Sequence, residues 1–532
     1  MKKNIKYLMG LAVVVSTCLS TTSCIDETEP TSGLTQNQID NSPNTISAMM
    51  MALPARANVL DARTGNFDDY AFGYGALMHL RDVQTGDMAI AFSNYDHFQP
   101  WEIVNGINEN TARAQWPWNY SYESIMASNK LIGTIGEVTE ESSTQEKAAL
   151  GVAYAYRALN YLDMAREYEF LPNDKFSNSN LVGLTVPIVD ENTTEEMAKN
   201  NPRATHEKMA EFILSDLDKA EELIPFLDKI SPSDKTLPHL AAVYGLKARY
   251  YMWNEDYTNA AQYALNAIKA SKMNPITYDK CLEVSGNQIS GYTKTCFNTL
   301  SEWMWGVKQT SENATVKTGI INWTSWMAPD ARFGYANAGV SPCMDKNLAQ
   351  RFSDNDWRQF FYDMSDPATP GLSHKFQPNE GNVKDSKIGA ASAYPLMRVE
   401  EMWFIYMEAL AHDNPAQGKA LLEQWMNKYR DLAGTYTCPY SDKDGIIDEI
   451  VAQKRIELWG EGQSFFDIKR LNMSVTRGYS GTNFFDEARL NTKGRPAWMN
   501  WVIVKSEANN NKALVDMNNP DPTGQYQVWT EE

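Results

Sequence analysis

The chain has 532 residues, a hydrophobic fraction of 43% and a formal net charge of −19. This hydrophobic content excludes general disorder, because it can form a sizeable core. The acidic charge makes nucleic acid a poor partner, because phosphate binding requires clustered Lys and Arg. The length predicts either two to four domains or one large helical array.

Residues 1–23 are typical of a secretory signal peptide. Three lysines precede an apolar run at residues 8–15, which is shorter than the roughly 20 residues of a transmembrane helix. Small residues then lead to Cys24, whose position resembles the lipidated cysteine of bacterial lipoproteins; a plain cleavage site with an incidental cysteine is the alternative. Residues 24–35 contain Pro, Gly and several acids, so we expect an acidic flexible tether. The pattern predicts membrane anchoring through a lipid at Cys24.

Long amphipathic helices are predicted along much of the remaining chain. Residues 145–168 carry apolar side chains at three- and four-residue steps, and a further helix follows Thr205, a plausible N-cap. Residues 240–270 place small and aromatic residues at the offsets of a tetratricopeptide hairpin. Residues 400–431 form a second candidate hairpin, with an Asn-Pro pair between its two periodic runs. An array of α-hairpins is therefore the leading architecture.

The middle of the chain has a different character. Residues 275–395 are rich in Gly, Asn, Ser and Thr, and their apolar runs are short. Residues 301–308 alternate in the manner of a strand. We therefore expect a loop-rich insert with a few short strands, and loops on a rigid scaffold commonly carry binding sites.

The sequence contains no recognisable catalytic or metal-binding motif. The six His residues are scattered, and HExxH, GxSxG, P-loop and GxGxxG patterns are all missing from the sequence. Acid clusters are expected by chance in a chain with 67 acids, and we interpret them as solvated loops. We predict no enzyme activity, no catalytic residue, no metal and no cofactor.

Four cysteines remain after the signal region, and none belongs to a CxxC pair, which excludes a zinc ribbon. They are Cys281, Cys296, Cys343 and Cys438. Either a disulfide, with Cys281 and Cys296 the closest pair in sequence, or buried free thiols would fit this pattern.

Several segments in a fixed order resemble the SusD/RagB family. They are residues 118–132, 202–220, 240–268, 394–411 and 447–472. The last segment fills most of the family's pattern of a basic residue, Glu-Leu, Glu-Gly and aromatic-Asp-x-x-Arg, with Arg455, Glu457, Leu458, Glu461, Gly462, Phe466, Asp467 and Arg470. It departs from the pattern at Gln453-Lys454, where Glu-Arg is typical, and at Gln463-Ser464, which replaces an Arg.

The resemblance implies a mainly α fold with about four tetratricopeptide-like hairpins and a loop-rich insert containing a few short strands. It implies one domain over residues 36–532, with helical pairs within about 145–270 and 395–472 and ligand-binding loops at about 60–115 and 275–395. The function implied is non-catalytic capture of oligosaccharides for a SusC-like TonB-dependent barrel transporter. The protein would be lipid-anchored in the outer membrane and would face the cell exterior. A peptide-capturing member of the family and a tetratricopeptide adaptor without a small ligand are the alternatives.

Two polar, non-periodic regions combine the residue types that bind sugars. Aromatic rings stack on the apolar face of a sugar, while Asn, Asp and Arg bond its hydroxyls. Residues 79–110 and 321–339 supply both types, and the resemblance places ligand aromatics in the same regions. The candidate ligand-binding residues are Arg81, Asp87, Tyr95, Trp101, Asn105, Trp323, Trp326 and Tyr335. For each Trp the alternative is a core position, and Arg81 and Asp87 could instead pair with each other.

Overall fold

The computed structural model describes residues 44–60, 68–90, 95–285, 288–292, 303–313, 316 and 319–531. The predictions for the signal peptide, the tether and Cys24 lie outside these residues. From Met49 onward the chain forms one compact unit.

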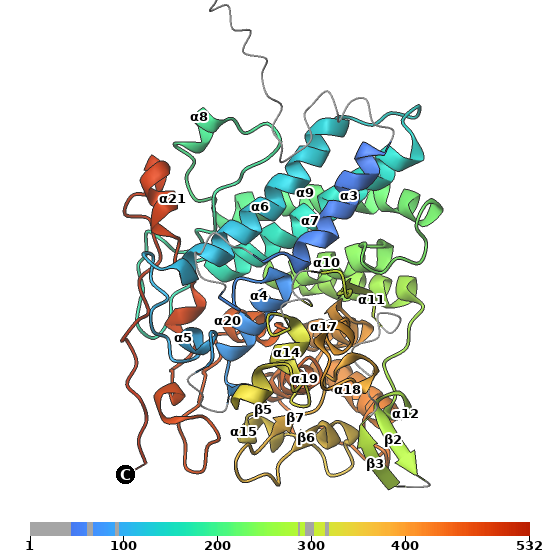
Figure 1. Cartoon of the computed structure of the whole chain (residues 1–532), viewed down its shortest axis with the longest axis vertical. Coiled ribbons are helices and arrows are strands. Elements are labelled where there is room, and N and C mark those ends of the chain that lie inside the picture. The colour runs from blue at the N-terminus through green and yellow to red at the C-terminus, as the bar shows by residue number, and fades with distance from the viewer. Residues whose placement is uncertain are drawn as a thin grey trace, which may run out of the picture. The chain divides into compact units, whose positions relative to one another are not determined.

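Helices dominate this unit, as predicted (Figure 1). The long ones are α6 (Ala112–Ile135), α7 (Thr144–Tyr168), α9 (His206–Leu223), α10 (Leu240–Trp253), α11 (Tyr257–Ser271), α17 (Val399–Asp413), α18 (Pro415–Tyr429) and α19 (Lys443–Glu457). The shorter ones are α3 (Thr45–Ala55), α4 (Gly73–Val83), α5 (Gln99–Glu102), α8 (Glu195–Ala198), α12 (Tyr278–Cys281), α14 (Trp323–Met327), α15 (Lys346–Ala349), α16 (Ser386–Gly389), α20 (Ser464–Arg470) and α21 (Lys505–Asn510).

Side-chain caps explain where several of these helices begin. Ser143 and Glu146 form a reciprocal capping box at the start of α7. Thr205 accepts a hydrogen bond from the Lys208 N–H and starts α9, which confirms the predicted N-cap. Asp442 caps α19 through the Gly445 N–H at 2.9 Å, so this member of an acid cluster has a structural role.

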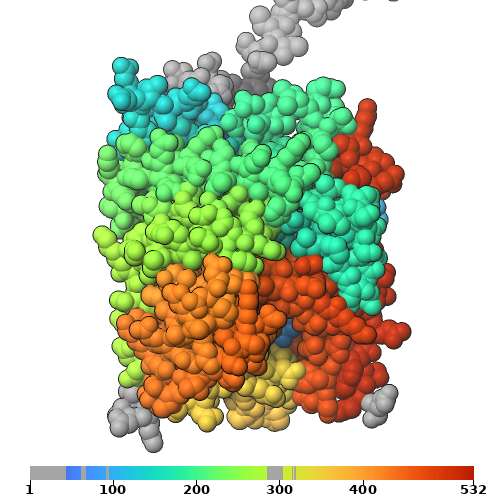
Figure 2. All heavy atoms as spheres, turned by 180° about the vertical axis from the view of Figure 1, so that it is seen from behind, coloured from blue at the N-terminus to red at the C-terminus, as the bar shows by residue number. Residues whose placement is uncertain are grey.

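The long helices pack side by side as the predicted array of hairpins. Helix α7 packs against α6 and α9, α10 packs against α11, and α11 also contacts α17, which in turn packs on α18 and α19. Figure 2 shows one face of this array, where the green segment containing α9 to α11 lies beside the orange segment containing α17 and α18. Small residues allow these close approaches. A Cβ added at Gly418 of α18 would lie 2.5 Å from the Ala411 Cβ of α17.

The predicted insert contains most of the strands, and every named strand pair is antiparallel. The strands are β1 (Met88–Ile90), β2 (Leu282–Ser285), β3 (Gln288–Tyr292), β4 (Trp305–Lys308), β5 (Pro342–Met344), β6 (Tyr362–Asp363), β7 (Leu372–Ser373) and β8 (Ala393–Met397). They form a sheet of order β1-β5-β7-β6 and the pairs β2-β3 and β4-β8. Pairing of β1 with β5 joins the region of residues 79–110 to the insert.

The strand prediction at residues 301–308 is confirmed for β4, and two tryptophans of this segment are core residues. Trp303 and Trp305 are both completely buried. The Trp305 indole donates to the Thr236 carbonyl at 3.1 Å and packs edge-on against Tyr156. The strand is therefore covered on both faces.

The segment that carries the family resemblance forms an internal ion network. The carboxylate of Glu457 accepts hydrogen bonds from Arg358, Arg398 and Arg430 at 2.8–3.1 Å. Glu461 accepts from Arg398 and from Lys375. These contacts connect α19 to α17, α18 and the insert. Glu457 and Glu461 of the motif therefore act as internal ion-pair partners that stabilise the fold.

The three cysteines that follow the signal region and lie among the described residues are all buried. They are Cys281, Cys343 and Cys438, and the last two are free thiols. Cys296 lies outside the described residues, so its pairing stays a prediction. Among the described helices, none combines the length and apolarity needed to cross a bilayer.

Candidate ligand-binding site

An aromatic cluster joins the two regions that the sequence singled out. We define the Tyr95 cluster as His79, Tyr95, Phe98, Trp326 and Tyr335. The ring of Tyr95 lies 5.5 Å from that of Tyr335, and Phe98 lies 5.0 Å from Trp326 and 6.2 Å from Tyr335. The His79 imidazole contacts two of these rings: it lies 4.5 Å from Phe98 and stacks on Trp326 at 6.3 Å. Four of these side chains are buried, whereas Tyr95 is 36% exposed.

Local structure explains how these side chains converge. His79 lies on α4, and Trp326 lies on α14, whose N-terminus is capped by Asn322 through the Ser325 N–H at 2.9 Å. Strand β1 follows α4 in the chain and pairs with β5 of the insert, with Ala89 opposite Cys343. This pairing holds α4 next to the insert. Two segments about 250 residues apart thus meet beneath Tyr95.

Two polar side chains, His97 and Asp69, lie beside the exposed ring of Tyr95. His97 lies 5.3 Å from it and 3.7 Å from the Asp68 carboxylate. Burial raises the pKa of Asp69 above its ordinary value, although Tyr335 and His97 oppose this effect. Burial lowers the pKa of His79 to about 3, so this imidazole is neutral at physiological pH. An aromatic face with carboxylate and imidazole groups at its rim matches the two needs of sugar recognition.

The three tryptophans predicted to stack on a ligand are core residues, which corrects that prediction. Trp101 is 3% exposed and packs edge-on against Tyr70 at 5.0 Å. Trp323 is 1% exposed and stacks on Tyr394 at 5.0 Å. Trp326 is equally buried within the Tyr95 cluster. Their polar sequence neighbours concealed this burial, because aromatic partners from distant segments cover them.

Arg81 and Asp87 are also internal, and they do not pair with each other. Arg81 donates to Glu167 and to Asp163 at 2.8 Å, and Asp87 accepts from Arg455 at 3.1 Å. Both side chains are buried, so the predicted ligand contacts are corrected to structural ion pairs.

Of the remaining candidates, Tyr335 is buried beneath Tyr95 and supports it, which corrects its predicted contact with a ligand. Asn105 is exposed, and its backbone N–H donates to the Pro100 carbonyl. Tyr95 and Asn105 are thus the predicted residues that the structure leaves accessible to a ligand.

Two features were not predicted from the sequence: the support beneath Tyr95 and a separate polar cleft. The first is the support given by His79 and Phe98, which no periodic pattern marks. The second is an open polar cleft of about 520 Å³, within the range of small-molecule sites. Its lining includes Arg351, Asn355, Tyr440 and Glu449. It lies between the loop after α15, the loop after α18 and Glu449 of α19, segments that only the tertiary structure brings together.

Across the residues that the structure describes, no three His, Cys, Asp or Glu side chains gather as a metal site.

Comparisons with known proteins agree on one family. Residues 44–252 match a family described as "Starch-binding associating with outer membrane", and residues 343–526 match the SusD family. The chain is 22% identical over 428 residues to a SusD-like protein, P38, of Formosa agariphila, covering 70% of this chain and 75% of that protein.

Solved structures share the fold. A SusD-like carbohydrate-binding protein from Bacteroides vulgatus has a TM-score of 0.68 at 21% identity, covering 89% of this chain and 98% of that one. Surface glycan-binding protein A from Bacteroides uniformis has a TM-score of 0.62 at 16% identity, covering 90% and 99%. The two family matches together span most of the chain, in the order expected for one continuous member. The chain belongs to the SusD/RagB family.

Proposed function

We propose that this chain is a non-catalytic surface lipoprotein that binds oligosaccharides and delivers them to a SusC-like TonB-dependent barrel transporter. The observation that carries the proposal is the exposed ring of Tyr95, held on a buried aromatic base with polar groups at its rim. The family description and the relatives described as carbohydrate- or glycan-binding support it.

The geometry around Tyr95 favours binding of a sugar ring. Tyr335 and His97 contact the Tyr95 ring from two directions, so its orientation is set before a ligand arrives. A preorganised aromatic loses little conformational entropy on binding, which leaves more of the stacking free energy as affinity. Asn105 offers amide groups on the same stretch of chain. The polar cleft near Arg351 provides a second candidate surface for an extended glycan.

The location and partner belong to the same proposal. Lipidation at Cys24 would anchor the protein in the outer membrane, and the acidic tether would place the binding unit outside the cell. Replacement of Cys24 by Ala should release the protein from the membrane fraction, and added protease should digest the wild-type protein on intact cells. Retention of the Cys24→Ala variant in the membrane fraction would contradict the anchor.

The central test is glycan binding by variants of matched exposure. Tyr95→Ala should weaken binding of a cognate glycan at least fivefold, the effect of about 1 kcal/mol that marks an important contact. Tyr278→Ala provides the control, because Tyr278 is 40% exposed and lies on α12, away from the cluster. Isothermal titration against a glycan panel gives affinity, and the melting temperature should stay unchanged in both variants. Equal binding by all three proteins would contradict the assignment of Tyr95.

The alternative functions give different results in the same experiments. Binding of a peptide pool without glycan binding would identify a peptide-capturing protein. Co-purification with a barrel, without binding of any small ligand, would identify an adaptor. Turnover of a glycan by the purified protein would show that it is an enzyme.

A further inference from the structure

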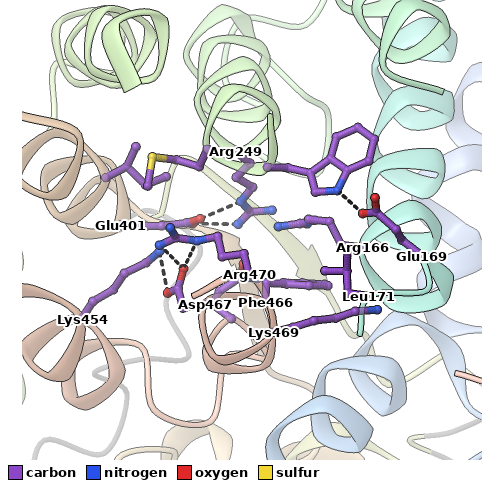
Figure 3. Close-up of a pocket in the computed structure, with 14 residues that line it drawn as sticks. Arg166, Glu169, Leu171, Arg249, Glu401, Lys454, Phe466, Asp467, Lys469 and Arg470 are labelled. Atoms are coloured by element: carbon purple, nitrogen blue, oxygen red, sulfur yellow. Dashed lines mark hydrogen bonds and ion pairs between the residues drawn. The ribbon is translucent and has the colours of Figure 1, made fainter. Parts of the chain in front are cut away.

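A small, partly open cavity lies where the helical array meets α20 (Figure 3). Its lining comes from the end of α7, from α10, α17 and α19, and from α20. It shares no residue with the Tyr95 cluster or with the polar cleft. Its volume is about 40 Å³. Since one water-sized group needs about 10–15 Å³, the cavity holds roughly three or four such groups.

The carboxylates of the lining are already occupied. Glu169 accepts hydrogen bonds from His206 and from the Trp253 indole, each at 2.8 Å. Glu401 binds Arg249 through two bonds of 2.6 and 2.7 Å, as Figure 3 shows. A cation in the same cavity would therefore find no unpaired carboxylate of these two to bind.

Asp467 is paired in the same way. It lies 2.8 Å from the ammonium of Lys454 and accepts from Arg470 at 2.8 and 3.0 Å. The dashed lines of Figure 3 follow these contacts. All three acids of the lining thus act as internal partners.

Two cationic side chains of the lining have unmet bonding capacity: among the described residues, Arg249 has one nitrogen without an acceptor, and Lys469 has no carboxylate partner. Arg249 is 3% exposed, and its Nη1 has no hydrogen-bond partner among the described residues. The Lys469 ammonium is equally buried and donates to the Glu167 carbonyl at 2.8 Å, but no described carboxylate lies within ion-pair distance. A buried donor without an acceptor costs about 1–3 kcal/mol, and more when charged.

The positive side chains around the cavity lie close to one another, and their mutual repulsion favours binding of an anion. Burial lowers the pKa of Arg166, and the charges of Arg249 and Arg81 add to this effect against the opposing charge of Asp163. Burial also lowers the pKa of Lys469 well below its ordinary value, with Glu169 opposing. An anion in the cavity would stabilise the protonated form of both groups.

Gln463 also lines the cavity, and its amide donates to the Glu461 carbonyl at 3.3 Å; the remaining lining residues are apolar. Leu171, Met252 and Ile405 contribute aliphatic groups, and Trp253 and Phe466 contribute rings. An inorganic oxyanion would leave this surface without a partner. A carboxylate with one or two carbons attached would pair with the cations through its oxygens and with the apolar groups through its tail.

We propose that this cavity is a binding site for a short-chain carboxylate of acetate or propionate size, held by Arg249 Nη1 and Lys469 Nζ. The site is additional to glycan binding and does not depend on it. Its occupation would complete the hydrogen bonding of Arg249 and tie α10 to α20.

Sodium propionate is the probe for the wild-type protein. Crystals soaked in propionate should show its carboxylate beside Arg249 and Lys469. Saturation-transfer NMR should detect propionate binding, and propionamide, which has the same shape without the charge, should not compete. Water alone in the cavity of soaked crystals would overturn the proposal, as would equal competition by propionamide. Binding of sulfate in place of propionate would overturn the assignment to a carboxylate.

Variants test the site without relying on one substitution. Lys469→Met should weaken propionate binding about tenfold or more, the value of one charge-assisted hydrogen bond. Leu171→Phe should abolish binding by filling the cavity while it leaves every charge in place. Lys130→Met removes an exposed lysine of α6 and should bind as the wild type does. Unchanged binding by both cavity variants would overturn the proposal. Tyr95→Ala should bind propionate normally, which separates this site from the proposed glycan site.

Discussion

Glu457 is the position where a single substitution should most affect the fold. Its carboxylate is 4% exposed and accepts hydrogen bonds from Arg358, Arg398 and Arg430. Glu457→Gln keeps the size of the side chain but leaves three buried guanidinium groups with one negative charge fewer. Removal of one partner from a buried ion pair costs about 3–5 kcal/mol, because the remaining charge is uncompensated. We therefore expect a loss of stability of about that size.

The assay is urea unfolding at pH 7, followed by tryptophan fluorescence. The control is Glu195→Gln, because the Glu195 side chain is 88% exposed and pairs with Lys199 at the surface of α8. Such a surface change should alter the free energy of unfolding by less than about 0.5 kcal/mol. If the two variants unfold at the same urea concentration, the network does not stabilise the protein and the reasoning is refuted.

The pH dependence gives an independent check of the same network. Burial alone would raise the pKa of Glu457, but Arg430 and Arg398 outweigh it and hold this pKa well below its ordinary value. A carboxyl whose pKa is lower in the folded state stabilises the protein above its unfolded pKa of about 4.3. That stabilisation is lost as the pH falls further. The difference between wild type and Glu457→Gln should therefore shrink below about pH 4, and a constant difference would contradict this assignment.

Three further predictions concern individual positions. The pKa of His79 is about 3, below its unfolded value, so wild type should lose about 1.4 kcal/mol per pH unit below 6.5 through this group. His79→Phe should remove that loss, so a change from pH 7 to pH 5 should lower the urea midpoint more for the wild type than for His79→Phe. An equal change in both proteins would contradict the prediction. Gly418→Val should destabilise the α17–α18 hairpin by about 1–3 kcal/mol, because its Cβ would meet Ala411; an unchanged melting temperature would contradict the packing. Thr205→Ala should cost about 1 kcal/mol by removing the N-cap of α9, whereas Thr205→Ser should retain it.

Much of the helical architecture could be predicted because its signals are local. The stripe at residues 145–168 corresponds to α7, and the Asn-Pro pair at 414–415 lies at the junction of α17 and α18. In the predicted hairpin of α10 and α11, Ala248, Ala260, Ala264 and Ala267 are fully buried, while Tyr251 is half-buried. A helix repeats every 3.6 residues, so one face can be read from a short window of sequence.

The candidate site could not be predicted as well, because burial in loops depends on distant segments. Trp101, Trp323 and Trp326 stand in polar stretches, yet Tyr70, Tyr394 and Phe98 cover them. The sequence singled out two separate regions, around residues 95 and 335, as candidate binding regions, and the structure brings Tyr95 and Tyr335 into contact. No periodic pattern distinguishes the exposed ring from the buried one.

Charged residues show most clearly which features depend on local sequence and which depend on tertiary structure. By itself, the sequence determined the helical hairpins, the loop-rich insert and the resemblance to one family, since these depend on composition and on spacing within single segments. Only the tertiary structure decided that Arg81, Asp87, Glu457 and Asp467 are internal ion pairs, and that Arg249 and Lys469 face a cavity. The reason is physical, because the cost of burying a charge depends on partners that the chain supplies from tens to hundreds of residues away.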